Sequence, residues 1–165
     1  MNMFSTKKLA LASLVLATLG ASGSALAASA SGTANATVLT PIAIAAGNTL
    51  EFGSFSPVAA GTVVIAAADG ARSATGGVVL VPGGTIRAGT FSVTGTGTQT
   101  FAITYPGSVN LTSGANTMAL QVAGPATGTL AAGAATINVG GALTVALNQA
   151  AGSYTGSYSM TVEYN

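Results

Sequence analysis

The chain has 165 residues, of which 49% are hydrophobic and only 4% are charged, with a formal net charge of +1. This composition provides no basic face for phosphate groups, so nucleic acid is not an expected partner. Disordered chains combine low hydrophobicity with high charge, and this one has neither, so we expect it to fold. Because it contains no Cys, disulfides and a lipid-modified N-terminal cysteine are excluded.

The first 27 residues have the features of a signal peptide. Lys7 and Lys8 precede an apolar run from Leu9 to Gly20, and Ala25-Leu26-Ala27 has the A-x-A form of a cleavage site. The run is shorter than the roughly 20 residues that a spanning helix needs. We therefore expect cleavage after Ala27, export through the inner membrane to the periplasm, cell surface or medium, and no membrane span in the mature protein.

The remaining 138 residues suit a single domain. Thr, Val, Ile and aromatic residues alternate between turn signals spaced about every 8–12 residues, and no helical period is sustained. The pattern predicts an all-β sandwich over residues 41–165, preceded by residues 28–40 as an N-terminal extension or first strand. The predicted strands are Ala34–Thr40, Ile42–Ala45, Thr49–Phe55, Thr62–Ala67, Ala71–Val81, Ile86–Gly95, Gln99–Tyr105, Met118–Val122, Thr136–Val139, Leu143–Ala146 and Tyr154–Tyr164.

Gly-rich pairs and triplets mark the connections between these strands. Asp69-Gly70 predicts a two-residue hairpin turn, and Pro82-Gly83-Gly84 predicts another chain reversal. Gly95–Thr98 and Thr75–Gly77 predict turns or bulges, and the Ala/Gly-rich stretch from Gly124 to Gly133 predicts a loop or a weak edge. A surface ion pair between Asp69 and Arg72 would brace the hairpin.

The core has to be built from few bulky side chains, supplemented by Val, Ile and Leu. These residues are Phe52, Phe91, Phe101, Tyr105, Tyr154, Tyr158 and Tyr164.

Catalysis is not expected from this chain. The mature part lacks His, Cys and Lys, so the usual general bases, thiol nucleophiles and Schiff-base amines are missing. Glu51 and Asp69 fall at a strand start and a turn, where a solvated residue and a turn former are the ordinary interpretation. Clustered metal ligands are also missing, so we expect no enzyme activity, no cofactor and no metal.

The last residues alternate more clearly than any other segment. Apolar residues and Gly occupy every second position from Tyr154 to Tyr164, and polar residues occupy the positions between them. This period of two predicts a half-buried strand. Its inward positions are Tyr154, Gly156, Tyr158, Met160, Val162 and Tyr164.

Three segments carry a family resemblance. LEFGSF at 50–55, GARSATGGV at 70–78 and NQAAGSYTGSYSMTVEY at 148–164 resemble an exported bacterial family classed as a domain of unknown function. That family is similar to spore-coat-U-type and archaic chaperone-usher fimbrial subunits. Gly152, fourteenth from the end, and the penultimate Tyr164 resemble the fimbrial C-terminal strand.

This resemblance implies an immunoglobulin-like, pilin-like sandwich that lacks its last strand. A periplasmic chaperone would fill the gap, and the N-terminal extension of the next like subunit would replace it. Tyr158, Met160, Val162 and Tyr164 would line the groove, and the chaperone would hold the carboxylate of Asn165. The donor arm would present Ala30, Ala34, Ala36 and Val38.

Two functions stay open at this point. The first is a non-enzymatic structural subunit of a fimbria-like or surface assembly that grows by β-strand addition. The second is a self-complete secreted or periplasmic sandwich that acts as a binding module, with its own first strand closing the sheet. The donor positions are mostly alanines, which bury little apolar surface, so backbone pairing would have to contribute most of the binding.

Overall fold

The computed structural model describes residues 27–165. The predicted signal peptide, except for Ala27, lies outside the described residues. The chain divides into two units, Met1–Ala36 and Thr37–Asn165. In the first unit, residues 27–36 are exposed and contain neither helix nor strand. No helix in the described part of the chain is long and apolar enough to cross a membrane.

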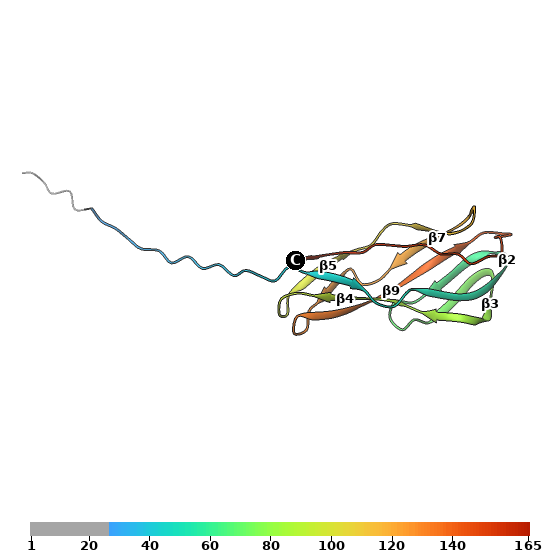
Figure 1. Cartoon of the computed structure of the whole chain (residues 1–165), viewed down its shortest axis with the longest axis horizontal. Helices are drawn as coiled ribbons and strands as arrows, with labels where there is room; N and C mark the ends of the chain where they lie inside the picture. The colour runs from blue at the N-terminus through green and yellow to red at the C-terminus, as the bar shows by residue number, and fades with distance from the viewer. Residues whose placement is uncertain (1–26) are drawn as a thin grey trace, which may run out of the picture. The chain divides into compact units, whose positions relative to one another are not determined.

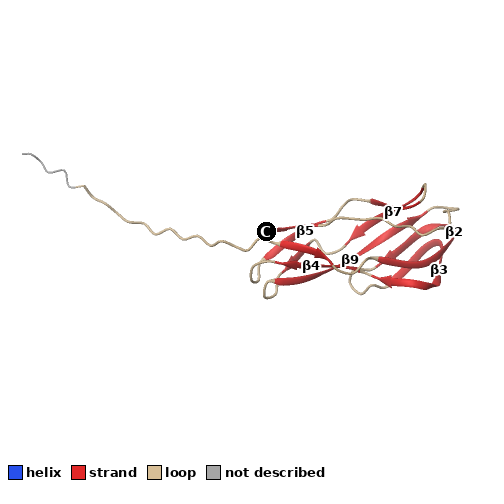
Figure 2. Cartoon of the chain, in the orientation of Figure 1, coloured by secondary structure: helices blue, strands red, loops and turns tan. Residues whose placement is uncertain are grey.

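The second unit is an antiparallel β-sandwich without helices in its described residues (Figures 1 and 2). All its strand pairings are antiparallel. The strands are β1 (Ala43–Ala46), β2 (Glu51–Ile65), β3 (Arg72–Arg87), β4 (Gly89–Thr94), β5 (Thr100–Thr104), β6 (Val109–Ser113), β7 (Asn116–Ala123), β8 (Thr127–Thr129), β9 (Ala134–Val145) and β10 (Thr161–Tyr164). This confirms the predicted all-β class.

The first four strands form one long ribbon that doubles back on itself. β1 pairs with β4, and β2 pairs with β3 out to Ile65 opposite Arg72. The register shifts between Pro57 and Gly61, where the ribbon bends. As a result the Arg72 guanidinium reaches the carbonyl oxygen of Phe52, at 2.9 Å, from the opposite end of the same ribbon. One half of the ribbon therefore covers the other.

β9 connects the two halves of this ribbon. Its first part pairs with β4, and its second part pairs with β2 and β7. The change falls at Gly140 and Gly141. A Cβ on Gly140 would collide with the carbonyl oxygen of Ile65 and lie 2.6 Å from the nitrogen of Ala67, so only Gly allows this close approach.

The hydrophobic core lies inside the sandwich. It contains eighteen buried apolar side chains, and the described residues bury no polar or charged ones. Phe52 and Phe101 are buried, as expected for two of the bulky residues. The other predicted core aromatics are partly buried against this cluster, namely Phe91, Tyr105, Tyr154, Tyr158 and Tyr164.

The C-terminal segment keeps the predicted faces but is not the predicted strand. Within this segment only residues 161–164 form a strand, β10, which pairs with β5. β5 also pairs with β8. Between Ala146 and β10 the chain is loop, apart from one bridge between Thr155 and Thr112 (Figure 2). Met160 and Val162 are buried, while Thr161 and Glu163 are exposed. Alternation thus identified the inward side chains, but it does not determine hydrogen-bond partners.

Several local predictions are corrected by the structure. Residues 34–40 form no strand, and 49–55 and 62–67 merge into β2. The segments at 136–139 and 143–146 likewise merge into β9, which ends at Val145. The stretch from Gly124 to Gly133 contains the short strand β8, and β6 was not predicted because its VNLTS sequence is short and lies beside Gly-rich turns.

Of the predicted turns, some are confirmed and others are wrong. The β2–β3 connection spans six residues, 66–71, and among them only Gly70 has positive φ, so a two-residue turn at Asp69-Gly70 is wrong. Pro82-Gly83-Gly84 does not reverse the chain but lies within β3, where the register with β2 shifts. Within Thr75–Gly77 only Gly77 lies at a register shift, opposite residues 58–60 of β2, whereas Thr75 and Gly76 are regularly paired. Gly95–Thr98 is confirmed as a turn.

The predicted ion pair between Asp69 and Arg72 is also wrong. Asp69 accepts a hydrogen bond from the nitrogen of Ala71 and so caps its own turn. Arg72 donates instead to the carbonyl oxygens of Phe52, Ser54 and Val81.

Candidate strand-addition groove

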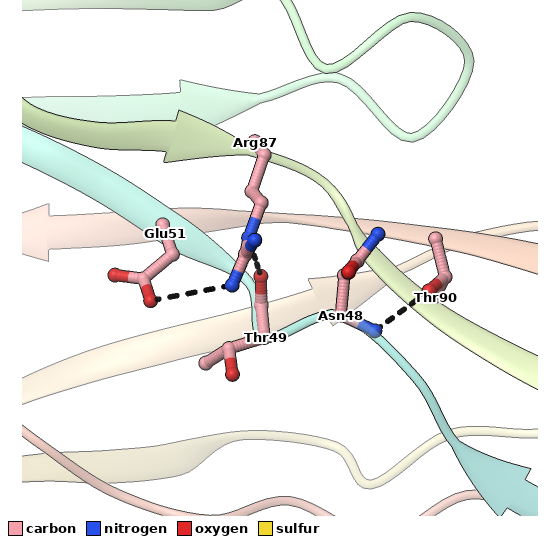
Figure 3. Close-up of polar contacts among 5 residues, drawn as sticks. All are labelled: Asn48, Thr49, Glu51, Arg87 and Thr90. Carbon is pink, nitrogen blue, oxygen red and sulfur yellow. Dashed lines mark hydrogen bonds and ion pairs between the residues drawn. The ribbon is translucent and has the colours of Figure 1, made fainter.

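Two charged residues of the described chain make contacts next to the link between β1 and β2. Glu51 lies 3.9 Å from Arg87, and both side chains are about 40% exposed. Arg87 also donates to the Thr49 carbonyl oxygen, and Asn48 donates its backbone N–H to Thr90 (Figure 3). These contacts connect the link between β1 and β2 to the end of β3 and the start of β4. No group of three or more His, Cys, Asp or Glu gathers within residues 27–165.

The more informative feature is an open strand edge. Residues 51–57 of β2 pair with β3 on one side, whereas β9 joins the other side of β2 only from Gly61 to Ile65. No described strand pairs with the second edge of residues 51–57, nor with the second edge of β1, whose only partner is β4. Unpaired backbone donors and acceptors of this kind are a template for another strand.

The C-terminal segment faces this open edge across a groove. The groove has a volume of about 620 Å³ and lies between residues 50–57 on one side and residues 149–154 on the other. Its floor is formed by Leu111 of β6, Met118 of β7 and Leu143 of β9. Its rims are small residues, including Gly53, Ser54, Ser56, Ala150, Ala151 and Gly152. The site is therefore a groove that apolar side chains and small residues line, with β2 along one wall.

The predicted assembly-strand residues are placed in different ways. Gly152 and Tyr154 line the groove, and the Tyr154 hydroxyl donates to the Ala150 carbonyl oxygen at 2.8 Å. Gly156 lies against β6, where a Cβ would come within 2.8 Å of the Asn110 carbonyl oxygen. Asn165 donates its backbone N–H to Thr100.

The remaining four residues of that segment point into the domain and do not line the groove. Met160 and Val162 belong to the core, each 8% exposed. The ring of Tyr158 meets Phe91 edge-on with centroids 5.9 Å apart. The Tyr164 hydroxyl accepts from the backbone N–H of Thr96 and donates to the carbonyl oxygen of Thr40.

Two tyrosines have perturbed acidity. Desolvation by burial raises the pKa of Tyr158 above its usual value, and it does the same for the pKa of Tyr105, with a smaller contribution from the nearby Tyr158. Both hydroxyls are therefore neutral at physiological pH. Neither has an adjacent base, so these shifts describe packing and not chemistry.

The predicted donor residues all lie outside the described strands. Ala30, Ala34 and Ala36 are exposed in the first unit, and Val38, in the second, is 94% exposed. Sequence reasoning assigned a groove to the C-terminal segment and missed its opposite wall, residues 51–57. The signal that could have found this wall was Gly53 within the predicted strand 49–55 and Pro57 just after it, since both weaken strand pairing and are typical of edges.

Fold and site together define a class, namely an antiparallel β-sandwich with an open strand edge facing a groove. Within that class, residues 42–164 match the model of the family described as Domain of unknown function (DUF4402), and the chain belongs to this family. It matches no curated protein and no solved structure.

Proposed function

We propose that the protein is a non-enzymatic, exported structural subunit of a fimbria-like or surface assembly, and that it assembles by β-strand addition into the groove between β2 and residues 149–154. Its partners would be a periplasmic chaperone and further copies of the same chain. The resemblance of the 50–55 and 148–164 segments to fimbrial subunits supports this proposal, as does the lack of His, Cys and Lys after residue 8.

One observation carries the proposal. The free edge of residues 51–57 and the segment 149–154, which belongs to no strand, face each other across a groove that Leu111, Met118 and Leu143 also line. A strand placed there would pair with the backbone of β2 and cover Leu111, Met118 and Leu143. Recognition through main-chain hydrogen bonds tolerates small side chains on the added strand.

Strand addition would be stabilised by many weak interactions along the length of the added strand. Each backbone hydrogen bond contributes about 0.5–1.5 kcal/mol net, and each buried CH₂ about 0.8 kcal/mol. A donor strand of alanines would therefore depend mainly on its backbone pairing. The small residues on the groove rims allow such a strand to approach closely.

A charge at the groove rim tests the proposal. Ala151 is exposed and lines the groove, so Ala151→Glu adds a carboxylate there without disturbing the core. We expect it to abolish polymer formation by purified mature protein in sedimentation and electron microscopy, with unchanged circular dichroism. Ala68 is another exposed alanine, in the β2–β3 turn, and Ala68→Glu is the matched control that should assemble normally.

The contrary outcomes are equally specific. Assembly by Ala151→Glu at the parent's rate would refute strand addition at this groove. A parent protein that stays monomeric and stable at all concentrations would instead support the self-complete binding module.

A further inference from the structure

β3 is an edge strand along its whole length. β2 is its only strand partner, and β3 stands at the end of the strand order β1-β4-β9-β2-β3. No strand in the described part of the chain pairs with its other edge. Where residues 54–57 pair with residues 78–81, the free edge of β2 and the free edge of β3 are opposite edges of one two-stranded ribbon. A contact at the β3 edge is therefore separate from strand addition to β2.

The direction of the β3 backbone groups follows from the contacts of Arg72. Its guanidinium donates to the carbonyl oxygens of Ser54, at 3.0 Å, and Val81, at 3.2 Å, and these two residues are paired with each other. One guanidinium reaches both oxygens because the two carbonyls point towards each other between the strands, as they do in a hydrogen-bonded pair. The directions alternate along a strand, so the N–H and C=O of Leu80 point away from β2.

The proline of β2 agrees with this assignment. Pro57 pairs with Val78 and has no N–H to donate to the ladder. Val78 therefore belongs, with Leu80, to the positions whose backbone groups point to the free edge. Neither residue takes part in the turn and loop hydrogen bonds of the described chain.

This edge lacks the features that keep edge strands apart. Natural edges are protected by charged side chains, Pro or bulges. Residues 73–86 include no charged side chain, and the run VVLV between Gly77 and Pro82 contains neither Pro nor a register shift. Val79 and Val81 are 52% and 38% exposed on its outer face. The edge is thus open, uncharged and apolar.

The same run is complementary to itself. Antiparallel pairing about a two-fold axis through Leu80 would place Val79 of each copy opposite Val81 of the other. The outward N–H of each Leu80 would meet the C=O of the other Leu80, and the exposed valines would cover one another. Pro82, which has no N–H, would end the pairing. So short a contact is weak by itself.

We propose that residues 78–82 of β3 form an interface with the same residues of a second copy, by antiparallel edge-to-edge pairing centred on Leu80. A second copy fits this edge because the two-fold axis gives each outward group of Leu80 a partner and brings apolar side chains together without opposing charges. The interface goes beyond the proposed function and does not use the groove. In a polymer it would join neighbouring filaments side by side, where many weak contacts reinforce one another.

A charge at the β3 edge tests the proposal. Mature Ala151→Glu protein, which carries its added charge at the groove, should show a concentration-dependent dimer in sedimentation equilibrium. Adding Val79→Lys should raise the Kd of this dimer about ten-fold or more, with unchanged circular dichroism. Leu147 is 60% exposed in the loop after β9, and Leu147→Lys is the matched control that should leave the Kd unchanged. Absence of the dimer, or the same Kd with Val79→Lys, would refute the interface.

Cysteine pairs test the register, because the chain contains no native Cys. With the axis at Leu80, positions 79 and 81 of opposite copies form close non-hydrogen-bonded pairs, whose Cα separation suits a disulfide. A mixture of Val79→Cys and Val81→Cys proteins should therefore cross-link under mild oxidation about ten-fold faster than either protein alone. Val79→Cys mixed with Leu147→Cys is the control and should cross-link slowly. Equal rates in all these samples would refute the pairing, whether or not the groove accepts a strand.

Discussion

The Arg72 guanidinium lies 2.9 Å from the carbonyl oxygen of Phe52, although Arg72 pairs with Ile65 and Phe52 pairs with Ile86 at the other end of the ribbon. The same guanidinium donates to Ser54 at 3.0 Å and to Val81 at 3.2 Å. One side chain therefore links distant parts of the doubled-back ribbon, and two of its three partners belong to residues 51–57.

Replacing Arg72 should loosen this arrangement. Arg72→Met removes three hydrogen bonds to carbonyl oxygens from a charged donor, and we expect the free energy of unfolding to fall by about 2 kcal/mol or more. Denaturant titration measures the change. Arg87→Met, which loses one carbonyl bond and an exposed ion pair, should cost about 1 kcal/mol or less. Equal losses in the two variants would mean that Arg72 does not hold the ribbon.

Gly140 should not tolerate a side chain. A Cβ would collide with the carbonyl oxygen of Ile65, so Gly140→Ala has to displace β9 from β2 and should destabilise the domain by about 1–3 kcal/mol. Gly107→Ala meets nothing within 4 Å and should stay within about 0.5 kcal/mol of the parent. Thermal and denaturant unfolding of both variants check this, and a neutral Gly140→Ala would contradict the close approach.

The two faces of the C-terminal segment should respond differently to charge. Met160 is 8% exposed in the core, so Met160→Asp buries a carboxylate without a partner and should cost several kcal/mol. Thr161 is exposed on the opposite face, and Thr161→Asp should cost about 1 kcal/mol at most, from strand propensity. Secreted yield and unfolding midpoints compare the pair. Similar losses would contradict the alternation.

Stability should fall in alkaline solution as two tyrosines titrate. The pKa values of Tyr105 and Tyr158 are raised above 10.0 in the folded protein. The folded state then holds its protons more tightly than the unfolded state, so this contribution is fully present below pH 10 and is lost as pH rises through the folded pKa values. Unfolding titrations between pH 8 and 11.5 should show a fall above about pH 10. Combining Tyr105→Phe with Tyr158→Phe should flatten that fall, and an unchanged slope would contradict it.

Much of the local structure followed from pattern alone. The strands at 100–104 and 116–123 were predicted within two residues, and Met160 and Val162 were correctly assigned to the inward face. These features depend on each residue's immediate neighbours, because side chains of a strand alternate with a period of two. The reversal expected at Pro82-Gly83-Gly84 failed because the same residues also fit a bulge within a paired strand.

The sequence by itself determined the all-β class and which side chains face the core, since both depend on local alternation and on the positions of Gly and Pro. Tertiary structure alone decided that the ribbon doubles back, that Arg72 reaches Phe52, that β9 joins β2 only beyond Gly140, and that Tyr164 bonds to Thr40 across 124 positions. The physical reason is that an open edge is defined by the partner it lacks. Strand partners are chosen by the packing of the whole domain, which no local period records.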